Sequence, residues 1–457
     1  MEPRQANRGW IERMRIAVVG AGIAGLGAAW ALSSRHRVTV FEAANYLGGH
    51  ANTRNISVDG QCLAVDTGFI VYNETNYPQL TKLFEHIGVK SEASDMSFAV
   101  SLNDGQIEYE GSLRGLLVQP SNLLRPTHLA MLRDVLRFYR TAPALLDRND
   151  GSEPTLGEFL DAGGYSRAFA EQHLLPMGAA IWSSTLDGMR DFPARSFVRF
   201  FVNHRLFDLG QRPSWRTVTG GSREYVRRLS TSFANRARLQ SPVVALRRTP
   251  AGVVLRSPYG GEEAFDHVIL ATHADQALQI LGDDATESER RVLGAFRYRE
   301  NRAVLHSDTG LMPRRRAAWA SWNYLSASRS AGAGHQVCVS YWMNRLQNLP
   351  IQSPVIVTLN PPRPPAEEKT YAEFSYDHPQ FDTAALQAQS QLPLIQGDQR
   401  TWFCGSYCGN GFHEDGLQAG LAVAQALGAV WPWADKVIPV SPAAHIVQPF
   451  TPLQAAE

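Results

Sequence analysis

The feature that most constrains the fold lies in residues 15–50, which read RIAVVGAGIAGLGAAWALSSRHRVTVFEAANYLGGH. Gly20, Gly22 and Gly25 break an apolar run and open a helix of small residues, and Glu42 ends a second apolar run. In a strand–turn–helix unit, such glycines free the turn, let a pyrophosphate reach the helix N–H groups, and bring helix and strand close together. A carboxylate about twenty residues further on can accept hydrogen bonds from ribose hydroxyls. The pattern predicts a nucleotide site, and the acid disfavours NADP because it would repel a 2′-phosphate. A glycine-rich turn that only packs two strands is the alternative.

The length and composition set the class of protein. A chain of 457 residues has room for two or more domains, and its net charge of +1 gives no general reason to expect nucleic acid as a partner. The apolar runs are too short to span a membrane, and residues 1–13 lack the apolar stretch of a signal peptide, so we expect a frayed leader there. Four cysteines are few for this length and favour a reducing, cytoplasmic setting. Cys404 and Cys408 lack a second ligand pair, so no metal site is expected.

Hydrophobic patterns indicate several returns to one sheet. The segments PVVALRRT, GVVLRS and HVILAT predict strands, and the last of them, which ends at Thr272 and His273, leads back into the first nucleotide-binding layer. The later segment TWFCGSYCGNGFHEDGLQAG predicts a strand, a glycine-rich loop and a helix of small residues. Residues 126–140, PTHLAMLRDVLRFYR, predict a helix with Leu129, Leu132, Leu136 and Tyr139 on one side.

We therefore expect an α/β fold. A Rossmann-like nucleotide-binding domain, with a parallel central sheet and helices, is interleaved with an α+β substrate-binding domain. The predicted boundaries are 14–93, 212–285 and 396–433 for the first domain, 94–211 and 286–395 for the second, and 1–13 and 434–457 for flexible or draped tails.

Three blocks of the chain resemble the flavin-containing amine oxidase superfamily, which includes amine oxidases, protoporphyrinogen oxidases and phytoene-type desaturases. They are residues 16–53, residues 266–273 (DHVILATH) and residues 403–420. The resemblance implies FAD rather than NAD. It implies non-covalent binding, because no segment matches the covalent cysteine motif of the monoamine oxidases. Two positions depart from the family pattern. His50 stands where the family has an arginine, with Arg54 as a candidate substitute, and Ser406 stands where it commonly has an acid.

The glycine-rich strand–turn–helix and the resemblance together predict the cofactor-binding residues. They are Gly20, Gly22, Ile23, Ala24, Gly25, Glu42, Ala43, Gly48, Gly49, His50, Thr53, Asp66, Gly68, Val243, Ala271, Thr272, Gly405, Ser406, Gly416, Leu417 and Ala419. Small residues at Gly416, Ala419 and Gly420 would let a helix N-terminus approach the flavin and stabilise negative charge on the reduced ring. A helix that packs on a neighbouring element through these small residues is the alternative.

The candidate catalytic residues gather in GNGFHEDGLQ and in the segment after DTGF. His413 and Glu414 precede the flavin-facing helix and could move a proton while a hydride leaves the substrate. Tyr72 and Asn73 are predicted to face the same cavity, as is Tyr407. For Glu414 and the neighbouring Asp415, helix capping is an equally good interpretation.

Aromatic strands favour a hydrophobic substrate. Residues 317–325 (AAWASWNYL) and 337–346 (VCVSYWMNRL) carry three of the ten tryptophans, although core packing explains most such residues. GGHANT together with GFHEDGL resembles a bacterial branch of the superfamily linked to fatty acyl modification. The sequence thus predicts an FAD-dependent oxidoreductase that desaturates a lipophilic substrate, a fatty acyl or phospholipid chain, by hydride transfer to flavin N5. An amine oxidase, a flavin-dependent isomerase and a non-catalytic FAD-bound lipid-binding protein are the alternatives.

Basic residues suggest a membrane contact. Arg133, Arg137 and Arg140 share one helical face and follow Arg125, and further positive charge comes from Arg190, Arg195, Arg199 and Arg205. Such a surface can rest on anionic lipid, which would place the protein peripherally at the inner face of the membrane. A solvated helix face is the alternative. The sequence gives no indication of oligomeric state.

Overall fold

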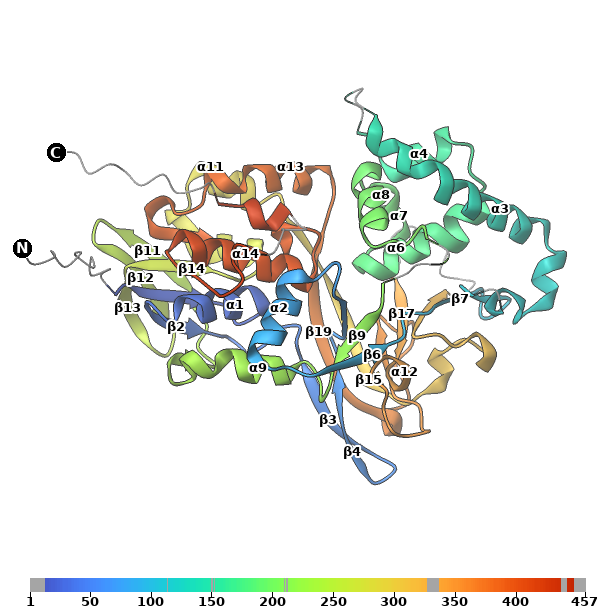
Figure 1. The fold of residues 1–457 in the computed structure, drawn as a ribbon, viewed down its shortest axis with the longest axis horizontal. Helices are drawn as coiled ribbons and strands as arrows, with labels where there is room; N and C mark the ends of the chain where they lie inside the picture. The colour runs from blue at the N-terminus through green and yellow to red at the C-terminus, as the bar shows by residue number, and fades with distance from the viewer. Residues whose placement is uncertain are drawn as a thin grey trace, which may run out of the picture.

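The computed structural model describes residues 13–112, 114–148, 151, 153–208, 210, 213–326, 337–436 and 442–447. The predicted leader, and much of the predicted C-terminal tail, lie outside these residues. Two regions stand out in Figure 1: a layered α/β region that contains β1 (Arg15–Val19) and α14 (His413–Ala426), and a region of sheet and helices at the opposite end.

A five-stranded parallel sheet forms the first layer, in the order β10-β2-β1-β14-β20. Its strands are β1 (Arg15–Val19), β2 (Arg37–Phe41), β10 (Ala237–Arg238), β14 (His267–Leu270) and β20 (Thr401–Phe403). β1 and β2 bury four of their five residues each, as expected for parallel strands covered on both faces. α1 (Ile23–Leu32) and α14 (His413–Ala426) pack together beside this sheet, although they come from opposite ends of the chain (Figure 1). The predicted mixed α/β fold with a parallel sheet is confirmed.

Shorter elements surround this layer. An antiparallel sheet is formed by β11 (Ala245–Thr249), β12 (Gly252–Ser257) and β13 (Gly261–Phe265). A hairpin joins β3 (Thr53–Val58) to β4 (Gln61–Asp66), and β5 (Val71–Asn73), β9 (Trp215–Val218) and β6 (Ser91–Ser94) form a small sheet. The helices are α2 (Pro78–Ile87), α9 (Arg223–Leu229), α10 (Ala274–Leu281), α11 (Glu287–Leu293) and α13 (Thr383–Gln391).

A seven-stranded sheet, in the order β19-β15-β18-β17-β16-β7-β8, forms the second large layer. Its strands are β7 (Phe98–Leu102), β8 (Ile107–Glu110), β15 (Arg297–His306), β16 (Trp322–Ser326), β17 (Cys338–Trp342), β18 (Ile356–Leu359) and β19 (Thr370–Gln380), with α12 (Met343–Leu346) following β17. The pairing is antiparallel except between β16 and β7.

Helices cover one side of this sheet at the upper right of Figure 1. They are α3 (Pro126–Thr141), α4 (Leu156–Ala162), α5 (Arg167–Phe169), α6 (Leu175–Trp182), α7 (Leu186–Arg190) and α8 (Ala194–Asn203). The helix predicted at 126–140 is confirmed, and two leucines of its predicted apolar row lie at the surface. Met131 and Phe138 are fully buried, whereas Leu129 and Leu136 are 49% and 59% exposed.

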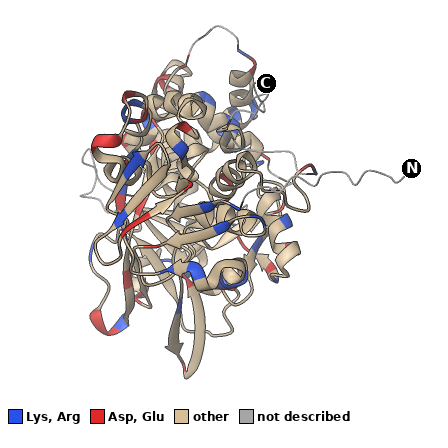
Figure 2. Ribbon diagram, turned by 90° about the vertical axis from the view of Figure 1, so that its left-hand side faces the viewer, with Lys and Arg blue, Asp and Glu red and all other residues tan. Residues whose placement is uncertain are grey.

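Charges of both signs are interspersed over the nucleotide-binding layer in Figure 2. Arg15 and Arg238 pair with Glu263, and Arg247 pairs with Glu262. In the part of the chain that the structure covers, no helix has both the length and the apolar content to cross a bilayer.

Candidate active site

A cavity of about 660 Å³ runs between the two large layers. One end lies at the carboxyl ends of the parallel strands, where Val19, Phe41 and Ala271 line the wall. The other end lies between the seven-stranded sheet and α6 and α8. Ligands of α/β sheets bind at the carboxyl ends of parallel strands, so the first end is the expected place for a nucleotide.

The first turn is shaped as a cradle. Gly20 has φ +100°, and a Cβ there would lie 2.7 Å from the carbonyl oxygen of Ala271. A Cβ on Gly22 would meet no atom within 4 Å, because this glycine borders the cavity. Gly49 has φ +58° and lies against Gly22. The backbone therefore leaves room for a pyrophosphate beside the N-terminus of α1.

Glu42 lies at the edge of this cradle. Its Oε2 accepts the N–H of Ala21 at 2.7 Å and its Oε1 accepts the N–H of Ala44 at 2.8 Å. Each carboxylate oxygen keeps further lone pairs, which can accept ribose hydroxyls. Glu42 lines the cavity together with Ala43 and Val243, which were likewise predicted to bind the cofactor.

Two predicted cradle glycines do not line the cavity. A Cβ on Gly25 would lie 2.0 Å from the carbonyl oxygen of Gly20, so Gly25 packs the helix onto its own turn. Gly48 has φ +123°, and a Cβ there would lie 2.5 Å from the carbonyl oxygen of Ala51. Both glycines therefore allow the close backbone packing of these turns without facing the cavity.

Thr53 and Asp66 were predicted to bind the cofactor, but both lie outside the cavity lining. Asp66 accepts the N–H and Oγ–H of Ser222, the Nε2–H of Gln347 at 2.9 Å and the Oγ1–H of Thr53 at 2.5 Å. Burial raises the pKa of Asp66 to about 6, although the hydrogen bonds from Thr53 and Ser222 oppose the shift. This network joins the β3–β4 hairpin to α9 and α12, so its role is structural.

The segment after β20 reaches the cavity, and the body of α14 does not. Gly405 and Ser406 line the cavity, as do the predicted Ile23, Ala24, Gly68 and Thr272. Gly416, Leu417 and Ala419 are not among the lining residues. A Cβ on Gly416 would lie 3.0 Å from Ile23 Cγ2, and a Cβ on Gly420 would lie 2.1 Å from the carbonyl oxygen of Ala24. Small residues therefore pack α14 onto α1, which was the alternative interpretation.

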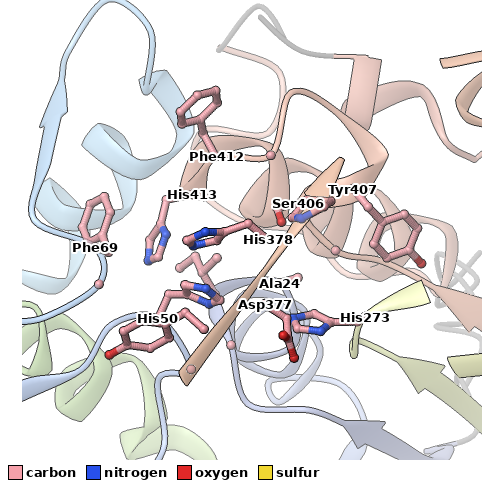
Figure 3. A pocket seen from close by; sticks show the side chains of 18 of the residues that line it. Ala24, His50, Phe69, His273, Asp377, His378, Ser406, Tyr407, Phe412 and His413 are labelled. Carbon is pink, nitrogen blue, oxygen red and sulfur yellow. The ribbon is translucent and has the colours of Figure 1, made fainter. Parts of the chain in front are cut away.

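Four histidines converge in the middle of the cavity, as Figure 3 shows: His50, His273, His378 and His413. The His50 ring lies 4.9 Å from the Tyr376 ring and 5.2 Å from the His378 ring. Burial lowers the pKa of His378 to about 4 and that of His50 well below its usual range. These imidazoles are therefore neutral at neutral pH.

The buried Nε2 of His50 has no hydrogen-bond partner among the described residues. A buried polar atom without a partner is costly, and a cofactor in the cavity would supply one. Arg54, the candidate substitute for the family's arginine, lies outside the lining and stacks over Tyr46 and Phe374. A neutral imidazole thus stands where the family places a guanidinium.

His413 lies at the first turn of α14 and lines the cavity. Its ring stacks on Phe69 at 3.7 Å, and its Nε2 lies 2.9 Å from the Tyr225 hydroxyl oxygen. Desolvation lowers its pKa to about 3. The ring is thus held rigidly and in its neutral form.

The other predicted catalytic residues have different positions. Glu414 accepts the N–H groups of Gln79 at 2.9 Å and Leu80 at 3.0 Å, so it caps α2 and lies outside the cavity lining. The Tyr72 hydroxyl donates to Ser91 Oγ at 2.9 Å, and Asn73 Oδ1 accepts the N–H of Asn76. Neither lines the cavity, because β5 turns both side chains toward neighbouring strands and loops. We therefore correct the prediction for these three residues.

Asp415 accepts the N–H of Phe412 at 2.8 Å, which agrees with a capping role. Tyr407, predicted to face the cavity, lies among its lining residues.

The far end of the cavity is apolar and aromatic. It is lined by Ile70, Val71, Met96, Ile181, Trp182, Phe200, Leu206, Trp322, Tyr341, Val357, Leu359 and Phe381. We call this end the apolar chamber. The predicted aromatic strands contribute Trp322 and Tyr341, whereas Trp319 and Trp342 pack around Arg316 instead.

Sequence analysis missed His378, Tyr376 and Phe69 as lining residues. Their positions depend on how β19 and the segment after β4 cross the cavity, and no local motif marks them. All four cysteines lie in the described part of the chain, and none lines the cavity. No group of three or more His, Cys, Asp or Glu among the residues described is arranged to hold a metal ion.

Comparison with known proteins agrees with this geometry. The family model of flavin-containing amine oxidoreductases matches residues 23–303. No curated protein matches the sequence significantly.

Solved structures share the fold at low identity. A CLA-producing fatty acid isomerase from P. acnes is 18% identical over 91% of this chain and 99% of its own, with a TM-score of 0.64. A cyclohexylamine oxidase from Brevibacterium oxydans IH-35A is 15% identical over 91% and 98%, also with a TM-score of 0.64. A putrescine oxidase with bound putrescine is 14% identical over 91% and 99%, with a TM-score of 0.65. The chain belongs to the flavin-containing amine oxidoreductase family and is an FAD-dependent enzyme.

Proposed function

We propose that the protein dehydrogenates a carbon–carbon bond of a lipophilic substrate, a fatty acyl or phospholipid chain. The apolar chamber carries this proposal. Among the described lining residues, the carboxylates are Glu42 at the adenosine end and Asp377, which Figure 3 shows beside His273. Neither belongs to the apolar chamber.

Substrate charge decides between lipid and amine. A protonated amine loses its hydration on entering an apolar site and needs a carboxylate or several aromatic faces in return. A fatty acyl chain gains free energy there, at about 0.8 kcal/mol per buried CH₂ group. The chamber offers aromatic faces but no carboxylate among its described lining residues, and its aliphatic wall of Ile70, Val357 and Leu359 favours the chain.

Different residues around the cavity would hold the cofactor and move the proton. FAD, when bound, supplies the hydride acceptor. Glu42 and the glycine turn would hold its adenosine end. His413 would relay the proton from the carbon next to the one that loses the hydride. With Nε2–H donating to the Tyr225 hydroxyl oxygen, Nδ1 has a free lone pair that can accept this proton, and the low pKa means that the imidazole passes it on rather than keeping it. The Phe69 ring keeps the imidazole in place.

Anaerobic reduction of the bound flavin tests this function. The FAD-loaded protein is mixed without oxygen with unsaturated or methylated phospholipids, and separately with primary and secondary amines. We expect the oxidised-flavin absorbance to bleach with a lipid and to persist with amines. Bleaching by amines alone would contradict the proposal and favour an amine oxidase.

Two further results would separate the remaining alternatives. A product isomeric with its substrate, formed only after the flavin is reduced beforehand, would assign an isomerase. One structural neighbour is named a fatty acid isomerase, so lipid products must be analysed for isomerisation. A flavin that no substrate reduces, in a protein that binds lipid tightly, would indicate a carrier.

A further inference from the structure

We propose that a surface on the outer side of the helical layer docks on an anionic phospholipid bilayer. The surface is formed by η2 (Pro120–Leu124) and α3, and we call it the leucine–arginine face. It consists of Leu123, Leu124, Leu129, Arg133, Leu136 and Arg140. This docking does not depend on which substrate the enzyme oxidises.

Exposed leucines are concentrated on this surface. Leu124 is 86% exposed, Leu136 59% and Leu129 49%. Of the twelve exposed large hydrophobic side chains in the described residues, five lie between positions 117 and 136. Single exposed leucines are ordinary on protein surfaces, but a group of them marks an interaction site.

The pattern along α3 sets the direction of this face. Leu129, Arg133, Leu136 and Arg140 are spaced four, three and four residues apart, so they form one stripe along the helix. Met131 and Phe138 lie on the opposite side and are fully buried in the core. The stripe is thus not a displaced core face, because the helix already has one.

The charge of residues 111–146 favours an anionic partner. Residues 111–146 contain five arginines and a single acid, Asp134. Asp134 is fully buried, and its Oδ1 lies 3.2 Å from Arg133 and 3.5 Å from Arg137. The six residues of the face are thus leucines and arginines, and the one acid of the segment is buried beneath them. Apolar side chains can enter the interface of a bilayer while the arginines meet anionic headgroups.

The face also belongs to the helical layer that borders the apolar chamber. Met131, Phe138 and Trp182 belong to one core cluster, and Trp182 lines the cavity. In Figure 1, α3 lies at the outer edge of this layer, at the end of the molecule opposite β2 and β13. A docked bilayer would thus lie on the chamber side and away from the nucleotide-binding layer.

Vesicle co-sedimentation of the FAD-loaded protein tests the docking. We expect the protein to sediment with vesicles of phosphatidylcholine and phosphatidylglycerol, to sediment much less with phosphatidylcholine alone, and to be released by salt. Arg140→Glu changes the charge by two units and should weaken binding about 30-fold, at about 1 kcal/mol per unit of charge. Leu124→Ser with Leu136→Ser should weaken it about tenfold or more.

Matched variants separate docking from general effects. Leu394 is 63% exposed and Arg256 is also exposed, but both lie on other elements. Leu394→Ser and Arg256→Glu should therefore leave vesicle binding within about twofold, since neither residue belongs to the face. Every variant should keep its flavin absorbance and melting temperature, which shows that it is folded.

Three outcomes would overturn the proposal. The wild-type protein could fail to bind anionic vesicles, or the control variants could lose binding as much as the face variants do. A dimer that dissociates on Leu136→Ser, seen by sedimentation velocity without vesicles, would assign the face to a second copy of the chain.

Discussion

The His413 ring lies between the Phe69 ring and the Tyr225 hydroxyl, and burial keeps it neutral. Another cavity-lining histidine, His204, directly follows α8, and its ring stacks on the Phe200 ring at 3.8 Å. Burial lowers its pKa to about 4. The two residues have the same chemistry and similar burial, so they allow a matched comparison.

We expect His413→Ala to slow substrate-dependent flavin reduction about 100-fold, the usual contribution of a positioned proton acceptor. Stopped-flow absorbance under anaerobic conditions measures the rate. The spectrum of bound FAD should be unchanged, because His413 is not part of the nucleotide cradle. His204→Ala should keep a rate within a few fold of wild type. Equal rates for wild type and His413→Ala would remove His413 from the mechanism.

Glu414 shows how a motif residue can serve structure. Burial raises its pKa to about 7, even though Gln79, Leu80 and Gln418 donate hydrogen bonds to it. A carboxyl with a raised pKa holds its proton more tightly when folded. The stability that it contributes is thus present below about pH 4.5 and is lost as pH rises through 7.

We expect Glu414→Gln to reduce the fall in the free energy of unfolding between pH 4.5 and pH 7, by up to about 3 kcal/mol. Urea unfolding at several pH values measures this difference. Glu373→Gln is the control, because Glu373 is a surface acid whose pKa is lowered by Arg302. The same pH slope in wild type and Glu414→Gln would contradict the assignment.

At the scale of elements, the sequence predicts those helices and strands whose pattern lies within one segment. The strand–turn–helix at the N-terminus and the helices at 126–141 and 413–426 follow from patterns within one segment. The faces that these helices turn to their neighbours depend on distant segments. α14 turns Gly416 and Gly420 toward α1, and α3 turns Leu129 outward, which no local pattern determines.

Two glycines should separate cofactor binding from folding. Gly22→Val places methyl groups in the open cradle and should weaken FAD binding about 100-fold or more, by blocking hydrogen bonds to the pyrophosphate. The apoprotein should still fold, since Gly22 has an extended φ of −72° and no atom near its Cβ position. Fluorescence titration with FAD measures the affinity.

Gly420→Ala, in contrast to Gly22→Val, should destabilise the folded apoprotein. Its Cβ would lie 2.1 Å from the backbone oxygen of Ala24, so α14 must move away from α1, at a cost of about 2 kcal/mol or more. The melting temperature of the apoprotein measures this cost. A stable Gly420→Ala apoprotein, or a Gly22→Val protein with normal FAD affinity, would contradict the packing described for the two helices.

At the scale of the whole molecule, the site is assembled from distant segments. Glu42, His50 and Gly22 come from the N-terminal part, Ala271 from the middle, and His378 and His413 from the C-terminal part. Local sequence motifs predict the residues at the adenosine end. The histidines and the apolar chamber depend on the crossing of β19, β16 and α6, which only the assembled chain shows.

The central claim is that this cavity binds FAD without a covalent bond. The most direct measurement is the absorbance spectrum of the purified protein, before and after incubation with excess FAD, followed by quantification of the flavin released on denaturation. The account predicts a yellow protein that holds one FAD per chain and releases it unmodified. A protein that is colourless and stays so in excess FAD would contradict it.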